Sequence, residues 1–396
     1  MGWVLLLLPL IVHPAIASGP ASSPARSQAP RGQMVSTMQA PGQAAAGQDQ
    51  PGQTPPAEPS QGAAPMDPDQ ASGLPTMQFR GFSDISYRLD DESGTANSFS
   101  LGQFNLFITS KLTDKLGVLA EVVVKAGQNN KVGIDIERLL LRWDWSDYLS
   151  VSAGRYHTAI GWYNTAYHHS AWMQTAIGRP LLFAFGNDGG FLPIHDVGLS
   201  LGGRIPSGDL GLRYIFEVGN GTASHSIDDE PVQNVVDENN GKSVNAALLA
   251  RPAVLPGFQV GISVYHDTLT PELRPEIGET IVAGHAVYQT PGVEWLNEVV
   301  FVRNAFADDG PVSDTVGFYT QASKQFGMWR PYFRYQYVNA PADDPVFPEV
   351  GLQYGPSVGL RCDVADSVAL KFQYDRTERR DLAGYNSFAV QVSFTF

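Results

Sequence analysis

Four histidines lie close together in one segment of the sequence, at His157, His168, His169 and His195. Imidazoles grouped in this way could coordinate zinc, which prefers nitrogen and sulfur ligands. No Asp or Glu stands at a ligand-like spacing beside them, and aromatic loops commonly use histidine for packing. We therefore expect no metal site and no other cofactor.

The stretch 198–202 (Gly-Leu-Ser-Leu-Gly) matches the G-x-S-x-G motif of serine hydrolases. That motif exposes its serine on a sharp turn from a strand to a helix, whereas here it lies inside a regular alternating segment. A pair such as His169 with a loop serine could attack lipid or protein, but no catalytic constellation stands out. We expect the chain not to be an enzyme.

The composition of the 396 residues excludes several classes of protein. Charged residues make up 17%, against about 25% in ordinary soluble domains. The single Cys362 excludes an internal disulfide framework and a cysteine-based zinc site. The net charge of −14 argues against binding to nucleic acid, and no apolar run is long enough for a transmembrane helix.

The first 17 residues are typical of a signal peptide. The run Trp3–Val12 has the length of an apolar signal segment, and Ala15–Ala17 supplies small residues before a cleavage site at Ser18. No Lys or Arg precedes the run, which departs from the usual pattern. A buried helix is the alternative, but Pro9 and Pro14 would break it. We expect an exported protein.

Residues 18–75 are rich in Pro, Gln, Ala, Gly and Ser and contain hardly any branched or aromatic side chains. Such a segment cannot bury enough apolar surface to offset the entropy of ordering it. We expect a disordered periplasmic leader.

From residue 76 onward, short segments with alternating polarity follow one another. In the last one Phe388, Val390 and Val392 share one face with the terminal Phe396, and polar residues occupy the other. Sixteen such segments are predicted at 77–89, 98–112, 116–125, 133–144, 148–157, 196–205, 209–219, 242–250, 257–266, 280–289, 293–303, 315–326, 330–338, 351–363, 367–377 and 385–396. A strand that ends in a terminal Phe is typical of bacterial outer-membrane barrels.

The connections between these segments alternate between short turns and longer loops, and the longest covers 158–195. Even strand numbers with tight turns on one side indicate a transmembrane antiparallel β-barrel rather than a soluble sandwich. Aromatic residues beside the short turns are typical of an interfacial girdle: Trp143, Trp145, Tyr148, Trp295, Phe326 and Trp329. We predict an all-β barrel of about sixteen strands over 76–396.

Charge is distributed unevenly over this barrel. The predicted outer loops hold 21 acidic and only five basic residues, which could bind divalent cations that bridge lipopolysaccharide. A strand cation that faces lipid at mid-depth costs about 2–4 kcal/mol, so strand Arg and Lys should face the lumen. Such an interior in a barrel this wide indicates a water-filled pore.

The long loop is too aromatic to be solvated, so we expect it to fold into the barrel and narrow the pore. Together with Arg80–Phe82, Glu137–Leu140 and Glu217–Gly221, this loop resembles the phosphate-selective porin O and P family. The resemblance covers about 76–220 and implies a sixteen-stranded, trimeric porin whose third loop forms the constriction.

The resemblance implies that lumen arginines attract anions. Constriction candidates are Arg155, His157, Trp162, Tyr163, His168, His169 and Arg179; wall candidates are Arg138, Arg213, Arg334, Arg361 and Lys371. The acidic mouth departs from the family, because a phosphate channel should attract anions there. The selectivity is therefore unassigned.

The sequence thus predicts an outer-membrane porin for passive diffusion of small solutes or ions, including anions such as phosphate. The alternative is a structural anchor or adhesin with acidic, cation-binding loops. Expected partners are outer-membrane lipid and lipopolysaccharide, the barrel-assembly machinery through Phe396, and further copies of the chain in a homotrimer. Nucleic acid is not an expected partner.

Overall fold

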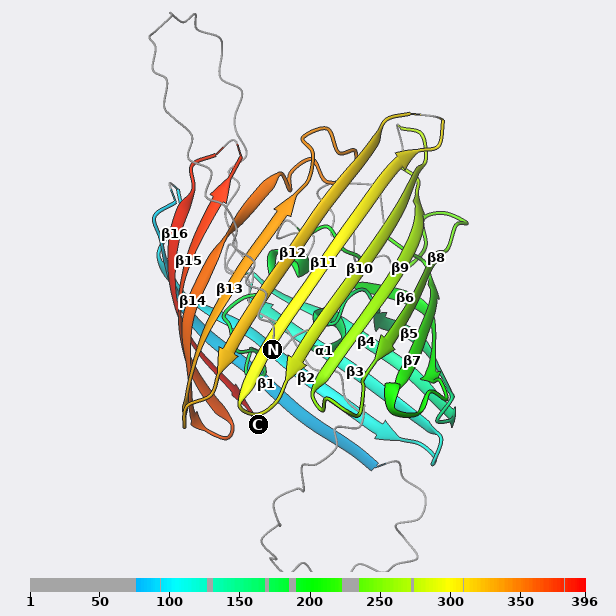
Figure 1. The fold of residues 1–396 in the computed structure, drawn as a ribbon, viewed down its shortest axis with the longest axis horizontal. Helices are drawn as coiled ribbons and strands as arrows, with labels where there is room; N and C mark the ends of the chain where they lie inside the picture. The colour runs from blue at the N-terminus through cyan, green and yellow to red at the C-terminus, as the bar shows by residue number, and fades with distance from the viewer. Residues whose placement is uncertain are drawn as a thin grey trace, which may run out of the picture. The chain divides into compact units, whose positions relative to one another are not determined.

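The computed structural model describes residues 76–92, 94–126, 131–167, 171–184, 190–222, 235–271, 274–308, 310–380 and 382–396. The predicted signal peptide and leader, residues 1–75, lie outside these ranges. Sixteen antiparallel strands form a closed barrel in which β1 pairs with β16 (Figure 1). This confirms the predicted fold class.

The strands follow one another around the barrel in sequence order. They are β1 (Thr76–Asp90), β2 (Ser98–Lys111), β3 (Leu116–Ala126), β4 (Val132–Ser146), β5 (Leu149–His157), β6 (His195–Arg204), β7 (Leu212–Gly219), β8 (Ser243–Ala250), β9 (Phe258–Leu269), β10 (Ile277–Gln289), β11 (Val293–Phe306), β12 (Val312–Lys324), β13 (Trp329–Asn339), β14 (Leu352–Ala365), β15 (Val368–Arg379) and β16 (Tyr385–Thr395). Each corresponds to one predicted segment. The main differences are at β9, which continues to Leu269, and β10, which begins at Ile277.

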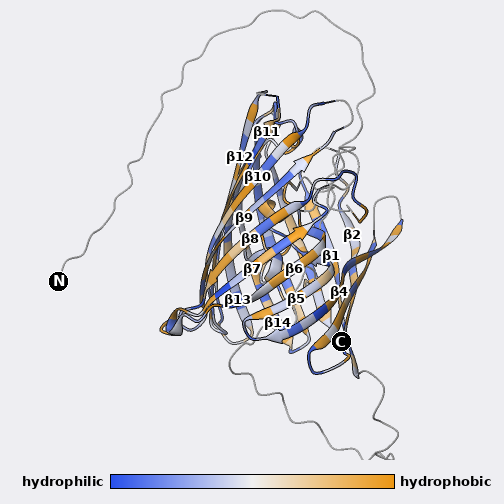
Figure 2. Cartoon of the chain, turned by 90° about the vertical axis from the view of Figure 1, so that its right-hand side faces the viewer, coloured by the Kyte–Doolittle hydropathy of each residue, from blue (hydrophilic) through white to orange (hydrophobic). Residues whose placement is uncertain are grey.

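Hydrophilic and hydrophobic residues alternate along the strands of the barrel wall (Figure 2). In β16, Phe388 and Val392 are exposed on the outer face, whereas Gln391 and Ser393 are buried on the inner face. In β9, Val260, Ile262 and Val264 are exposed and Ser263 and Tyr265 are buried. An outer face of this kind suits contact with lipid.

The turns that follow the even-numbered strands lie at the end of the barrel that carries the C-terminus (Figure 1). Five of them span two to four residues: 112–115, 147–148, 290–292, 325–328 and 366–367. The alternation is not strict, because the turn 251–257 is longer than the connection 380–384 on the opposite side.

Phe396 closes the barrel against Gly81. The two residues exchange backbone hydrogen bonds of 2.8 and 3.0 Å, and a Cβ atom on Gly81 would lie 2.4 Å from the Phe396 ring. The ring also lies near Phe104 and Phe394, with centroids 6.1 and 6.2 Å apart. The terminal residue therefore forms part of the seam between the first and last strands.

Helical structure in the described residues is confined to short segments. Helix α1 (Tyr163–Ala166) and the 3₁₀ turn η2 (Leu181–Phe183) belong to the connection between β5 and β6, and η4 (Gly208–Leu210) lies between β6 and β7. None of the helices in the described residues is long and apolar enough to cross a membrane.

Candidate channel lumen

The connection between β5 and β6, residues 158–194, folds into the barrel and is called the inward loop below. Figure 1 shows its helix α1 inside the ring of strands. The base of the loop is closed by a hydrogen bond of 3.1 Å from Thr158 N to Ile194 O. Asn164 also stabilises this base, because its Nδ2 donates to Thr158 O and to Ile194 O, each at 2.9 Å.

Apolar side chains of the inward loop pack on the inner wall of the barrel. Tyr163 stacks on Phe183 with ring centroids 5.3 Å apart, and the cluster continues to inward side chains of β9–β13 such as Ile281 and Val300. Part of the inner wall is therefore apolar, which corrects the expectation of a polar, charged interior. The aromatic loop is buried as predicted, but it is buried against an apolar sector of the wall.

Two glutamates of β11 hold the inward loop, one at Trp162 and Tyr163 and the other at Thr175. Glu298 accepts hydrogen bonds from the backbone N–H groups of Trp162 (2.5 Å) and Tyr163 (2.9 Å) and from the Tyr319 hydroxyl (2.7 Å). Glu294 accepts from Thr175 Oγ1 at 3.1 Å. We call Glu294 and Glu298 the anchor acids.

Three cations of β13–β15, called the wall cations below, hold the middle of the loop through carbonyl oxygens of residues 171–178. Arg361 Nη1 donates to Trp172 O at 2.6 Å and to Gln174 O at 2.8 Å. Arg334 Nη1 donates to Gly178 O at 3.0 Å, and Lys371 Nζ donates to Ala171 O. Both Arg334 and Lys371 are almost fully buried. The wall cations thus face the interior as predicted, but they bind the loop.

Arg179 is also a structural contact of the inward loop. Its Nε donates to Phe183 O, and its guanidinium lies 5.5 Å from the centre of the Tyr163 ring. Arg155 lies on β5, opposite Leu139 and Val197, and is buried. Both predicted constriction arginines therefore lie inside the barrel, Arg155 on the wall and Arg179 in the inward loop.

Burial of the loop aromatics changes their acidity. Removal from water raises the pKa of Tyr163 to about 12, although Arg179 and Arg334 oppose the shift. Burial, together with the charge of Glu294, raises the pKa of Tyr167 well above its ordinary value. Trp162 packs edge-on against Tyr167 with centroids 5.0 Å apart. These predicted constriction aromatics are core residues of the loop.

The histidines are only partly brought together. His157 and His195 lie opposite each other on β5 and β6 with ring centroids 5.3 Å apart, and His195 Nε2 lies 2.7 Å from Glu137 Oε2. His168 and His169 lie outside the described residues. Within the described ranges, no three His, Cys, Asp or Glu side chains are arranged to hold a metal ion.

A β-bulge in β4 turns two successive charged residues inward. Glu121 of β3 pairs with Arg138 and Val122 pairs with Ile136, so Glu137 is the extra residue. Arg138 Nε lies 2.6 Å from Glu121 Oε2, and Glu137 contacts Lys125 at 2.9 Å. Bulges commonly re-aim side chains in this way. The predicted wall residue Arg138 is therefore inward and ion-paired.

Arg213 lies on the inner face of β7 at the end of the barrel near the short turns, opposite Arg204 and Leu249. Partial desolvation and the like charge of Arg213 lower the pKa of Arg251, which lies in the following turn region. Arg251 Nε donates to Gln259 Oε1 at 2.6 Å. Arginines therefore gather on this side of the barrel, away from the wall cations.

The acids that position the loop were not among the predicted site residues. Glu294 and Glu298 lie four positions apart in one strand and therefore share a face. Glu217 of β7 adds a third contact by accepting from Ala159 N at 2.9 Å. The sequence signal that could have identified these acids is their position on the inner face of a membrane-spanning strand.

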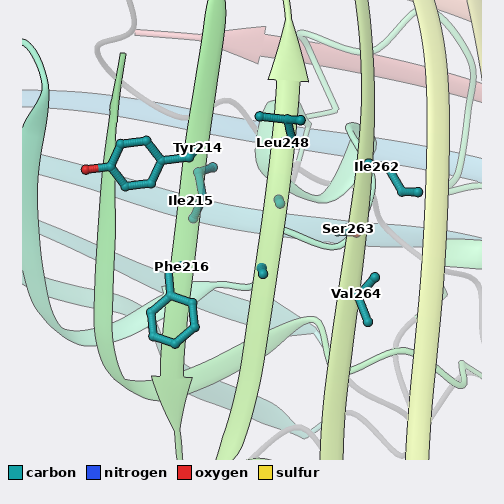
Figure 3. A pocket seen from close by; sticks show the side chains of 9 residues that line it. Tyr214, Ile215, Phe216, Leu248, Ile262, Ser263 and Val264 are labelled. Atoms are coloured by element: carbon teal, nitrogen blue, oxygen red, sulfur yellow. The ribbon is translucent and has the colours of Figure 1, made fainter. Parts of the chain in front are cut away.

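The outer face carries a depression of its own, on β7–β9. Figure 3 shows Tyr214, Phe216, Leu248, Ile262 and Val264 around it. Its lining is almost entirely apolar, and Phe216, Leu248 and Ile262 are exposed. This depression belongs to the surface that faces lipid and not to the lumen.

Comparisons with known proteins place the fold. No protein-family model and no curated protein sequence matches the chain. Among solved structures, the outer membrane channel DcaP of Acinetobacter baumannii matches with a TM-score of 0.56 and 11% identity over 82% of this chain and 99% of that one. OmpF of Salmonella typhi in complex with daunomycin gives 0.55 and 12% identity over 81% and 97%. OmpT, an outer membrane protein of Vibrio cholerae, gives 0.54 and 10% identity over 81% and 98%.

The chain has the fold of outer-membrane porins and channels. At these identities the similarity concerns the fold alone. An apolar outer face on a closed barrel of this type belongs in the outer membrane of a bacterial cell. The resemblance to the phosphate-selective porin O and P family stays a prediction.

Proposed function

We propose that this protein is an outer-membrane porin, a water-filled channel for passive diffusion of small solutes or ions. The observation that carries the proposal is the inward loop, which is fixed to one sector of a sixteen-stranded wall. A barrel of this size is too wide to be filled by its wall side chains alone. A loop fixed in this way narrows the lumen.

The test is conductance in a planar lipid bilayer. The purified protein should insert and give discrete current steps in potassium chloride, and a salt gradient should then give a reversal potential that reports ion preference. Complete absence of current from correctly folded protein would refute the proposal.

Anion preference, including transport of phosphate, is a finer part of the proposal. It is supported by Arg155 and Arg213, whose positively charged side chains lie on the inner side of the wall. The acidic outer loops oppose it at low salt, where their field extends further. A reversal potential that shows cation preference at both high and low salt would refute it.

A second candidate function is a structural anchor or adhesin. It is favoured by the apolar cluster around Tyr163 and Phe183, because a packed interior is needed for stability and not for conduction. The acidic outer loops would then bind cations or partners. The same bilayer experiment separates the two functions, since an anchor need not pass ions.

Assembly follows from the same proposal. OmpT of Vibrio cholerae has been solved in a trimer form, and we propose a homotrimer for this chain, embedded in lipid and lipopolysaccharide and assembled through recognition of Phe396. Native mass spectrometry in detergent tests the trimer. The proposed cleavage before Ser18 and the leader 18–75 are tested by sequencing the mature N-terminus.

A further inference from the structure

Inward side chains at the outer end of β9–β12 form a row of oxygen-bearing groups. Asp267 lies opposite Glu279, Glu279 opposite Asn304, and Asn304 opposite Ser313. All four are buried, with exposed fractions of 2%, 2%, 0% and 7%. Directly opposed residues in an antiparallel pair have Cβ atoms about 4.5–5.5 Å apart, so their side chains share one space.

Hydrogen-bond donors are supplied very unevenly to the carboxylates at this place. Asp267 accepts from Thr222 N and Thr268 N, both at 2.8 Å, and from the Tyr265 hydroxyl at 3.1 Å. Asp344, from the connection between β13 and β14, accepts from Asn304 Nδ2, Thr315 Oγ1, Val346 N and Phe347 N. The oxygen atoms of both carboxylates are therefore supplied with hydrogen-bond donors.

Glu279 lacks such support. Within the described residues no donor or cation contacts its carboxylate, and the charges that act on it are those of Asp267 and Asp344. A buried carboxylate between two others is strongly unfavourable unless positive charge is added. Glu279 therefore requires either a cation or a proton.

Two neutral oxygen atoms beside Glu279 also lack partners. Asn304 Oδ1 and Ser313 Oγ are buried and accept no hydrogen bond from any described residue. Orphaned buried acceptors are rare in folded proteins. A cation coordinated by the row would satisfy the carboxylate and both neutral oxygens together.

We propose that a hydrated divalent cation of the calcium or magnesium type binds between Glu279, Asn304 and Ser313. Hard cations of this type take oxygen ligands and retain water in the remaining positions. Asp267 and Asp344 supply negative field from either side. Its ligands are one carboxylate and two neutral oxygen atoms, so the site differs from a cluster of three metal-binding acids.

A bound cation would also strengthen the contact between the wall and the connection that carries Asp344. Asp344 belongs to the same short segment as Phe347, and Phe347 packs edge-on against Phe191 of the inward loop with centroids 5.9 Å apart. Neutralising the carboxylates around Asn304 would reduce repulsion at the point where this segment meets the wall. Occupancy should therefore stabilise the outer end of the barrel.

In the competing arrangement Glu279 is protonated, and its O–H group donates a hydrogen bond to Asn304 Oδ1. It would neutralise Glu279, but it would leave Ser313 Oγ without a partner and add no charge to offset Asp267 and Asp344. The two arrangements differ in their response to calcium.

The test is calorimetric titration of calcium chloride into full-length mature protein that has been purified in detergent and washed with EDTA. We expect one site with a dissociation constant of about 10⁻⁴–10⁻³ M, as in extracellular calcium modules, and a calcium-dependent rise in the unfolding temperature. Glu279→Gln and Asn304→Leu should each weaken this site at least tenfold. Asp308→Asn, which removes an exposed acid from the next connection, is the matched control and should leave it unchanged.

Two outcomes would overturn the proposal. The first is that calcium neither binds nor raises the unfolding temperature, which is the result expected of a protonated Glu279. The second is that all variants, including Asp308→Asn, show the same weak binding, which indicates only diffuse association with acidic loops. Neither measurement involves ion conduction, so the site is judged separately from the proposed channel function.

Discussion

Removal of the Glu298 carboxylate should release the first half of the inward loop. This carboxylate accepts from Trp162 N, Tyr163 N and the Tyr319 hydroxyl, and all three donors are buried. A buried donor left without a partner costs about 1–3 kcal/mol. Glu298→Ala should therefore destabilise the docked loop by roughly 3–9 kcal/mol if the three losses add.

Even the lower limit of that range changes the population of an undocked loop substantially. Since about 1.4 kcal/mol corresponds to a factor of ten, the undocked state should gain roughly a hundredfold or more. In single-channel recordings, Glu298→Ala should show larger current steps and frequent fluctuations between conductance levels. The wild type should give steady steps.

A graded series separates loop release from general damage. Tyr319→Phe removes one donor and keeps the ring beside Tyr163 (6.2 Å) and Phe183 (6.3 Å), so it should change the current noise only slightly. Glu298→Gln should give an intermediate result, because one of two acceptor oxygens is retained. If Glu298→Ala conducts as steadily as the wild type and with the same step size, the loop is not held by this carboxylate.

Three further predictions concern the seam, alkaline pH and selectivity. Gly81→Leu should sharply reduce the heat-modifiable folded fraction on gels, because the new side chain meets the Phe396 ring. Gly133→Ala is the control and should assemble normally, since nothing lies within 4 Å of its Cβ. Equal folded yields of the two variants would contradict a role of Gly81 in closing the barrel. The raised pKa of Tyr163, about 12, means that folding favours its neutral form: this stabilisation is complete below about pH 10 and is lost as the pH rises towards 12. Current noise should increase over that interval, and Tyr163→Phe should abolish the increase; noise that is flat to pH 12 would refute the assignment. Arg155→Gln should shift the reversal potential towards cations at about 1 M salt, where only charges within about 3 Å are unscreened, and an unchanged potential would remove Arg155 from the ion path.

The strands could be predicted from the sequence because a wall with lipid on one side requires strict alternation. Val260, Ile262 and Val264 face outward for this reason, and all sixteen segments were found within a few residues of their observed bounds. The inward loop was also predictable, since a segment as aromatic as Trp162–Tyr167 cannot be solvated. Both inferences depend on hydrophobicity along a single stretch of chain.

The contacts of the loop could not be predicted, because they join residues that are far apart in the sequence. Trp162 and Glu298 are separated by 136 positions, and Ala171 and Lys371 by 200. A one-residue bulge at Glu137 also changes which face a charge occupies, and alternation alone places either Glu137 or Arg138 inward but not both. The contacts of Arg334, Arg361 and Lys371 with loop carbonyls could not be predicted for the same reason, and the role of the inward cations in the pore stays a prediction.

The charges of the wall match the polarity of the loop backbone. Where the loop enters the barrel, it presents N–H groups, and acids of β7 and β11 accept from them: Glu217 from Ala159, and Glu298 from Trp162 and Tyr163. Farther along it presents carbonyl groups, and the wall cations of β13–β15 donate to them. A reversed loop would place N–H groups against arginine and carbonyls against glutamate, so this arrangement specifies one docked orientation. Because the wall cations donate to loop carbonyls, we expect ion preference to depend on other charges of the inner wall, and Arg155→Gln tests one of these charges.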